Sequence, residues 1–272
     1  MAWLPEVTKD VNKFPLVHTR RNQDSLINAY HMHQVPKMPQ TIVLIRHAQA
    51  LHNVDQDWNI HDPDLSSLGL EQCQELRENL LQRFGNETDA LIIVSPMRRT
   101  IQTALLSLDW LIKKGVHIQA DARWQENSAK PCDTGSSVAN LTAEFPSVDF
   151  STVDRVYPDK ISLAGAEYAF TKEAILRRAR AGVSSLRDRK ETLIFVVSHS
   201  GFLRLGVTGY WFFNGDYRMF ELDEDERTDK PPKLRQLEST LSGGLGKSWI
   251  DPVIIGSGLP APQIYPEETA SS

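Results

Sequence analysis

Short apolar runs alternate along the chain with longer segments in which apolar residues recur at helical spacing. The runs contain no Gly or Pro, and they cover residues 41–45, 90–94, 117–120 and 193–197. The helical segments span residues 68–84, about 96–114 and 167–189. Continuous apolar runs are typical of parallel strands covered on both faces, and their alternation with helices predicts right-handed crossovers. The pattern predicts an α/β fold, a three-layer sandwich in which helices flank a mostly parallel central sheet.

Residues with strong preferences for helix ends mark two of these helices. Ser66 and Ser67 can cap the helix over 68–84, and Gly85 follows its last residue. Pro96 fits the first position of the next helix, because its missing N–H would have no partner there. These residues therefore support the boundaries that the apolar pattern predicts.

Composition narrows the classes of function without selecting one. Of the 272 residues, 40% are hydrophobic and 24% charged, so a sizeable core is available. A net charge of −5, with basic and acidic residues interspersed, argues against a nucleic-acid partner. No apolar run approaches the roughly 18 residues of a membrane span, and none follows Met1 as a signal peptide requires. We therefore expect no membrane association. The chain has only two cysteines, outside any Cys/His cluster, so we expect no zinc site and a cytoplasmic location.

Charged and titratable side chains follow the predicted strands closely. The residues just beyond the strand ends include two arginines, two histidines and one glutamate: Arg46, His47, Arg99, Glu126 and His199. Open α/β sheets bind ligands beyond the carboxyl ends of their strands. An isolated Arg-His pair would be the start of a solvated loop, but the full set predicts a common crevice.

Five motifs occur in a fixed order along the chain. They are RHAQALHN at 46–53, LSSLGLEQ at 65–72, SPMRRTIQTA at 95–104, the glutamate of WQEN at 124–127, and VVSHSGFLR at 196–204. Together they resemble the histidine phosphatase superfamily, the group that includes cofactor-dependent phosphoglycerate mutases. The ordered set is more specific than any single motif. The resemblance implies a phosphoglycerate mutase-like fold, a small phosphorylated substrate, and neither a metal nor another cofactor.

The resemblance assigns the chemical steps to His47 and Glu126. A neutral His47 imidazole can attack phosphorus without a metal if a backbone carbonyl holds its other nitrogen, and a phosphohistidine then forms on it. Glu126 is the expected general acid for the departing oxygen and then the base that activates water. Some relatives use an aspartate directly after the second histidine instead, and Ser200 occupies that place here.

The phosphate oxygens are expected to be bound by Arg46, Asn53, Arg99 and His199. The two arginines offer forked donors that a lysine cannot reproduce, and a protonated His199 and the Asn53 amide add further donors. Arg98 competes with Arg99 for the second arginine position. The family spacing of four residues after the serine selects Arg99.

The substrate pocket is less well defined by the sequence. Ser200, Trp58 and Trp124 are candidates to line it. The two tryptophans are compatible with an apolar substrate, and the range of candidate substrates extends from sugar phosphates to prenyl phosphates.

Three functions are compatible with the motifs. The first is a metal-independent phosphatase that hydrolyses small phosphate monoesters through a phosphohistidine. The second is phosphoglycerate mutase-type phosphoryl transfer, but the usual mutase wording, Glu-Ser and then Trp before the asparagine, is absent from AQALHN. The third is a catalytically inactive binding or scaffold protein, which has no physical need for the retained cluster of charged and titratable residues.

The distribution of prolines, charges and apolar runs divides the chain into three regions. Residues 1–37 are predicted to form an N-terminal arm, for which packing on the body, disorder and self-association as a homodimer all remain open. Residues 38–222 form the predicted histidine phosphatase domain. Residues 223–272 turn acidic and then rich in Pro, Gly and Ser, which predicts an extended C-terminal tail.

Overall fold

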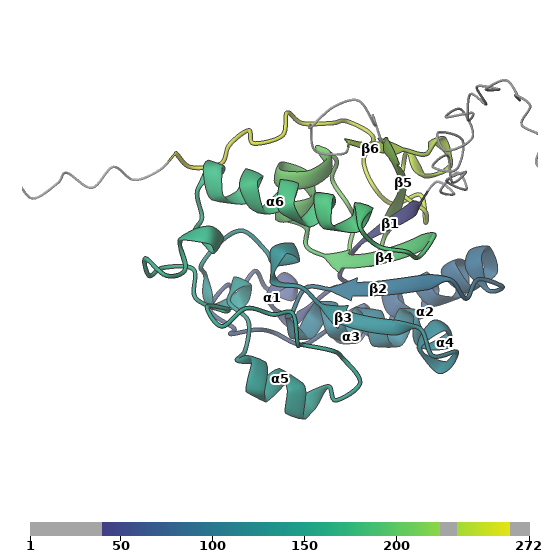
Figure 1. Cartoon of the computed structure of the whole chain (residues 1–272), viewed down its shortest axis with the longest axis horizontal. Coiled ribbons are helices and arrows are strands. Elements are labelled where there is room, and N and C mark those ends of the chain that lie inside the picture. The colour runs from purple at the N-terminus through teal and green to yellow at the C-terminus, as the bar shows by residue number, and fades with distance from the viewer. Residues whose placement is uncertain (1–39, 224–232, 262–272) are drawn as a thin grey trace, which may run out of the picture. The chain divides into compact units, whose positions relative to one another are not determined.

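The computed structural model describes residues 40–223 and 233–261 (Figure 1). The predicted N-terminal arm lies outside these ranges. The strands are β1 (Thr41–Arg46), β2 (Ala90–Val94), β3 (His117–Ala120), β4 (Leu193–Ser198), β5 (Tyr217–Asp223) and β6 (Lys233–Gln236). The α-helices are α1 (Leu51–Val54), α2 (Ser67–Phe84), α3 (Arg98–Ser107), α4 (Asp109–Lys113), α5 (Val138–Glu144), α6 (Lys172–Arg187) and α7 (Ser200–Phe202). Shorter turns are η2 (Ala122–Trp124), η3 (Pro131–Asp133), η4 (Ala166–Tyr168) and η6 (Glu238–Thr240), and α7 continues into the π-helix η5 (Leu203–Thr208).

The described strands form one mixed sheet in the order β3-β2-β4-β1-β5-β6. β3, β2, β4 and β1 are mutually parallel, whereas β5 pairs antiparallel with β1 and β6 pairs antiparallel with β5. The four predicted strands are therefore confirmed. Because they run in the same direction, the residues that follow them emerge at one edge of the sheet.

Helices cover both faces of this sheet, as Figure 1 shows. Alternate side chains of a strand point to opposite faces, and in the central strands both sets are buried. Val43 clusters with Leu76 of α2 and Ile101 of α3 on one face. Leu44 clusters with Ile175 of α6 on the other. The fold is thus the predicted α/β sandwich of three layers.

Two predicted helix boundaries differ from the structure. The segment 96–114 forms two helices, α3 and α4, with Leu108 between them, and α3 begins only at Arg98. The Met97 N–H donates to the Ser95 carbonyl at 2.8 Å, so Pro96 lies in a turn before the helix. The helix predicted over 167–189 is confined to α6, because the Thr171 side chain caps its first turn and residues 166–168 form the separate turn η4.

Residues 233–261 of the predicted tail pack against β5. β6 pairs with β5, and the buried Arg218 of β5 donates to the carbonyl oxygens of Leu241 and Trp249, each at 2.6 Å. Ser248 donates its hydroxyl proton to Asp216 at 2.6 Å. The division of the chain into arm, domain and tail remains a prediction. These contacts connect part of the predicted tail to the predicted domain.

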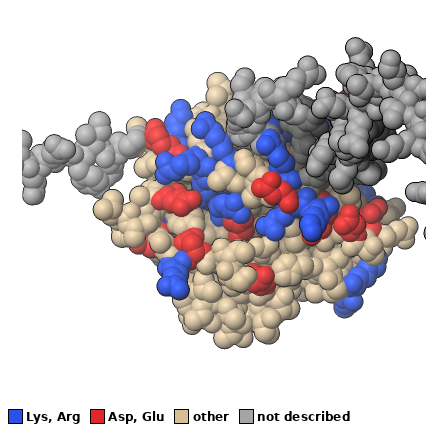
Figure 2. All heavy atoms as spheres, viewed as in Figure 1, with Lys and Arg blue, Asp and Glu red and all other residues tan. Residues whose placement is uncertain are grey.

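The surface around α6 carries charges of both signs. Figure 2 shows basic and acidic side chains interspersed over this helix on the face drawn. Within residues 40–223 and 233–261, no helix has the length and apolar character needed to cross a membrane.

Candidate active site

The two predicted catalytic histidines meet at the carboxyl edge of the sheet. β1 and β4 are neighbours in register, with Arg46 opposite Ser198, so His47 and His199 leave the sheet side by side. Their ring centroids are 5.2 Å apart. Ser95, which follows β2, is hydrogen bonded through its hydroxyl to Nε2 of His199 at 2.8 Å. The three residues at the centre of the site, Ser95, His199 and His47, therefore follow the adjacent parallel strands β2, β4 and β1.

The environment of His47 defines its tautomer. Nδ1 lies 2.7 Å from the carbonyl oxygen of Ala48. A carbonyl only accepts hydrogen bonds, so Nδ1 carries the proton and Nε2 of the neutral ring keeps its lone pair. Nε2 accepts a hydrogen bond from Nε of Arg99 at 3.2 Å. The carbonyl contact that a nucleophilic histidine requires is therefore present.

The charge state of His47 follows from its surroundings. Burial lowers the pKa of the imidazole well below its ordinary value, and the positive charges of Arg99 and Arg46 lower the pKa further. The hydrogen bond to Ala48 acts in the opposite direction. His47 is consequently neutral at pH 7, which is the form that can act as a nucleophile.

Arg99 contacts both histidines and the segment that contains Cys132 and Asp133. Its buried guanidinium donates through Nη1 to the carbonyl oxygen of Cys132 at 2.6 Å and through Nη2 to Oδ1 of Asp133 at 3.3 Å. Nη2 also lies 3.0 Å from Nδ1 of His199. Asp133 was not among the residues selected from the sequence, although the structure places its carboxylate against Arg99.

The protonation of His199 is set by the same contacts. Nδ1 accepts from Arg99, so Nε2 is the protonated nitrogen and donates to Ser95. Burial, followed by the charge of Arg99, holds the pKa of His199 well below its ordinary value. His199 is neutral in this arrangement, and the protonated form expected from the sequence requires the charge of a bound dianion.

The remaining arginines lie in different environments. Nη1 of Arg46 donates to the carbonyl oxygen of Phe212 at 2.8 Å, and its guanidinium carbon is 5.8 Å from the centroid of Trp211. Burial lowers the pKa of Arg46 to about 10, which leaves it charged at pH 7. Arg98 instead forms an ion pair with Glu144 at 2.8 Å. Arg99 thus contacts both histidines, whereas Arg98 faces Glu144.

Glu126 is held by backbone donors at the start of α7. Oε2 accepts from the N–H of Gly201 at 3.0 Å, and Oε1 accepts from the N–H groups of Phe202 and Asn127 at 2.8 and 2.9 Å. Burial raises the pKa of the Glu126 carboxyl, and the charge of Asp133 raises the pKa further, against the effect of the backbone donors. A carboxyl with a raised pKa suits general acid chemistry near neutral pH.

His52 lies beside His47, although it was not among the residues selected from the sequence. Only 4% of its surface is exposed, and its ring centroid lies 6.1 Å from that of His47. Nε2 of His52 is hydrogen bonded to the side-chain amide of Asn53 at 3.0 Å, while Oδ1 of Asn53 accepts from the N–H of Ala50 at 3.1 Å. Burial, followed by the charge of Arg99, lowers the pKa of His52 to about 4. Asn53 therefore orients a second neutral imidazole beside His47.

The three candidate pocket residues lie at different depths. Trp58 is 40% exposed, its ring is 5.8 Å from that of His52, and Nζ of Lys130 lies 5.2 Å from its centroid. Ser200 is partly buried at the start of α7. Trp124 is fully buried and packs edge to face on Phe202 at 5.9 Å. Its burial does not fit the predicted pocket role, and we interpret Trp124 as a core residue.

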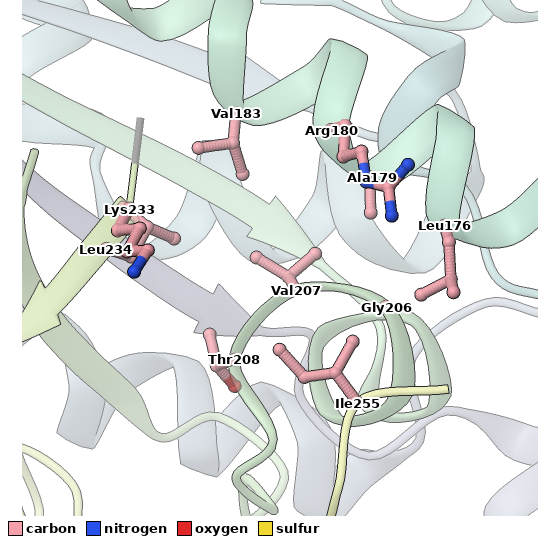
Figure 3. A pocket seen from close by; sticks show the side chains of 10 residues that line it. All are labelled: Leu176, Ala179, Arg180, Val183, Gly206, Val207, Thr208, Lys233, Leu234 and Ile255. Atoms are coloured by element: carbon pink, nitrogen blue, oxygen red, sulfur yellow. The ribbon is translucent and has the colours of Figure 1, made fainter. Parts of the chain in front are cut away.

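A separate cavity of about 620 Å³ lies between α6, η5, β6 and the segment near Ile255 (Figure 3). Its lining is mostly apolar, with Arg180 and Lys233 among its residues. None of the predicted site residues lines it. We therefore assign the chemistry to the edge of the sheet.

Comparison with known proteins identifies the class. The family model of the histidine phosphatase superfamily (branch 1) matches residues 42–223, and the chain belongs to this superfamily. Its α/β sandwich is the phosphoglycerate mutase-like fold of these proteins.

Individual relatives share less than a third of their aligned residues with this chain. Phosphoglycerate mutase-like protein 1 of Arabidopsis thaliana is 28% identical over 212 residues, which cover 65% of this chain and 72% of the relative. A Schizosaccharomyces pombe protein named "Probable phosphatase" is 29% identical over 171 residues, which cover 61% of this chain and 76% of the relative. The solved structure of a mycobacterial glucosyl-3-phosphoglycerate phosphatase is 18% identical with a TM-score of 0.43, covering 73% of this chain and 97% of that one.

Proposed function

We propose that the protein is a metal-independent phosphatase that hydrolyses small phosphate monoesters through a phosphohistidine on His47. The observation that carries this proposal is the His47 ring, whose Nδ1 is held by the Ala48 carbonyl and whose unprotonated Nε2 faces Arg99. Membership of the superfamily and the name of the Schizosaccharomyces pombe relative support phosphatase activity.

In the first step, Nε2 of His47 attacks phosphorus and a P–N bond forms. The ester P–O bond breaks, its electron pair leaves with the oxygen, and protonated Glu126 gives that oxygen its proton. Arg46 and Arg99 stabilise the negative charge on the phosphoryl oxygens, as a metal ion does in other phosphatases. The fixed guanidinium donors make a metal unnecessary in this mechanism.

In the second step, water attacks the phosphohistidine. The Glu126 carboxylate takes a proton from the water as the new P–O bond forms. The electron pair of the P–N bond returns to Nε2, and phosphate leaves. His47 is again neutral and Glu126 is again protonated, so the cycle is closed.

Phosphate release from a panel of monoesters in the presence of EDTA tests this proposal. Wild type should release phosphate, and His47→Ala should lose about 10³-fold or more in kcat/KM because the nucleophile is gone. His117→Ala, which changes an exposed histidine paired with Asp149, is the matched control and should retain activity. Rapid acid-free quenching with labelled substrate should trap a base-stable, acid-labile phosphoenzyme in wild type.

Other outcomes point to the competing functions. Full activity in His47→Ala would remove the central assignment. Transfer of phosphate between positions of a sugar phosphate, with little release, would identify a mutase. Bound inorganic phosphate without any turnover would identify a binding protein of the same fold.

A further inference from the structure

A buried lysine contacts the loop that carries Glu126. Lys160 belongs to the irregular segment between α5 and η4, and only 4% of its surface is exposed. Its ammonium donates to the carbonyl oxygens of Glu126 at 2.8 Å, Ser128 at 3.0 Å and Asp133 at 2.5 Å. An ammonium has three N–H donors, so all three are used on this loop.

These three contacts fix both ends of a segment whose side chains enter the site. At one end, the Glu126 carboxylate meets the N–H groups that open α7. At the other end, the Asp133 carboxylate meets Arg99, and it also accepts from the hydroxyl of Ser128 at 2.6 Å. Lys160 thus joins the backbone of Glu126 to the backbone of Asp133 through a single side chain.

A second buried cation holds the preceding part of the same loop. Nη1 of Arg178 donates to the carbonyl oxygens of Arg123 at 2.9 Å and Gln125 at 2.6 Å, and Nη2 donates to Oδ1 of Asn127 at 3.3 Å. Arg178 is fully buried because α6 packs on this loop. Arg178 therefore holds the residues on both sides of Glu126, and Lys160 holds the carbonyl of Glu126 itself.

Burying an ammonium is costly, since the charge loses its hydration, and burial accordingly lowers the pKa of Lys160 to about 7. An apolar residue at position 160 would avoid that cost but would leave three buried carbonyl oxygens without this donor. The ammonium donates to carbonyl oxygens in the same loop that carries the Glu126 carboxyl. A displacement of about 1 Å in a catalytic group can cost roughly 10²-fold in rate.

We propose that Lys160 is a positioning residue that holds the Glu126 carboxyl in place for proton transfer by anchoring the 126–133 backbone. This inference rests on the proposed function, in which Glu126 acts as acid and base. The hydrogen bonds of Lys160 go to three backbone carbonyl oxygens and to none of the side chains assigned to the reaction. Its loss is therefore expected to impair the proton-transfer steps while leaving phosphate binding intact.

The leaving group of the substrate provides a readout that a purely structural role would not move. Nitrophenolate leaves as a stable anion and needs no proton, whereas an alkoxide must be protonated as it departs. Because kcat/KM reports steps up to formation of the phosphoenzyme, we compare this constant for p-nitrophenyl phosphate and for an alkyl phosphate in wild type, Lys160→Met and Glu126→Gln. The control is Lys113→Met, an exposed lysine that pairs only with Asp109 among the described residues.

Lys160→Met should lose roughly 10- to 100-fold in kcat/KM for the alkyl phosphate and much less for p-nitrophenyl phosphate, in the same direction as Glu126→Gln. Its affinity for inorganic phosphate should be unchanged. Equal losses on both substrates, or no loss on either, would overturn the proposal. If Lys160→Met does not fold, Lys160→Gln, which keeps two N–H donors, is judged by the same ratio.

Failure of this inference is distinct from failure of the proposed function. If the proposed function is wrong, wild type itself releases phosphate from neither substrate. If only the role of Lys160 is wrong, wild type and Glu126→Gln differ as expected while Lys160→Met does not follow Glu126→Gln.

Discussion

At the scale of single residues, His47 and Glu126 are driven in opposite directions by the same burial. Burial disfavours the charged form of each group, so it lowers the pKa of the imidazole and raises the pKa of the carboxyl. Near neutral pH this favours a neutral histidine and extends the range in which the glutamate keeps its proton. Those are the two forms that the first step of phosphoryl transfer needs.

The charge of Asp133 should be visible in the pH dependence. Asp133 raises the pKa of Glu126, so Asp133→Asn should lower that pKa. Glu126 must carry a proton to act as the acid, and this form is lost as pH rises through its pKa. The alkaline limb of kcat/KM for an alkyl phosphate should therefore move to lower pH.

A full pH profile of both proteins checks this shift. Asp149→Asn, which removes a carboxylate paired with exposed His117, is the control. A limb that stays in place or moves to higher pH would show that Asp133 does not act on Glu126.

Gly201 leaves the space that the Glu126 carboxyl occupies. A Cβ at position 201 would lie 2.6 Å from Oε1 of Glu126, so Gly201→Ala must displace that carboxyl. We expect kcat/KM for alkyl phosphates to fall by about 10²-fold. Gly182→Ala is the matched control, because its Cβ would meet the Trp124 ring at an ordinary 3.4 Å.

Steady-state kinetics and thermal unfolding of both glycine variants separate misplacement from instability. Gly201→Ala should keep its unfolding midpoint near that of wild type while losing activity. Wild-type kinetics in Gly201→Ala would mean that the carboxyl position is unimportant.

At the scale of elements, β4 aligns the chemistry because it lies between β2 and β1. All six of its residues are buried, and Phe195 packs edge to face on Phe84 with centroids 5.5 Å apart. The strand register places His199 beside His47. Packing on both faces of β4 therefore supports the geometry of the site as well as the stability of the fold.

Truncation of Phe195 tests the contribution of this packing. Phe195→Ala should lower the free energy of unfolding by about 3–5 kcal/mol, since a large buried ring is replaced by a cavity. Urea denaturation measures the change, and Leu70→Ala on the exposed face of α2 should alter it by no more than about 0.5 kcal/mol. A change of under about 1 kcal/mol for Phe195→Ala would contradict the role given to this core.

At the scale of the whole molecule, residues 233–261 contribute to the body of the fold. They supply β6 and the carbonyl oxygens of Leu241 and Trp249 to the buried Arg218. Removing them would leave a buried guanidinium without these partners, which is costly. The C-terminal segment is therefore expected to be needed for stability.

Two truncations measure this dependence. A chain ending at Asp223 should be less stable by about 3 kcal/mol or more, because Arg218 loses buried hydrogen bonds and β5 loses its outer neighbour. A chain ending at Ala261 keeps every described contact and should unfold like wild type. Equal thermal midpoints for both would place the end of the domain at β5, as the sequence predicted.

The alternation of apolar runs and helical segments was sufficient to predict the four parallel strands. Arg46, His47, Arg99 and His199 could be predicted to lie together because Arg46 ends β1 and the other three come within a few residues of a strand end. Parallel strands end at one edge, so residues at their ends must converge. The number of residues that separates them along the chain does not affect this convergence.

Other parts of the site were decided only by tertiary packing. His52 enters the site because Asn53 turns its ring, Arg178 is buried because α6 packs on the Glu126 loop, and Lys160 reaches that loop from a distant irregular segment. No periodicity marks such contacts, because a polar side chain in a loop has the same local pattern whether it is solvated or bound to a distant carbonyl. The sequence by itself determined the strands and the residues at their ends, while the tertiary structure decided which buried charges hold them in place.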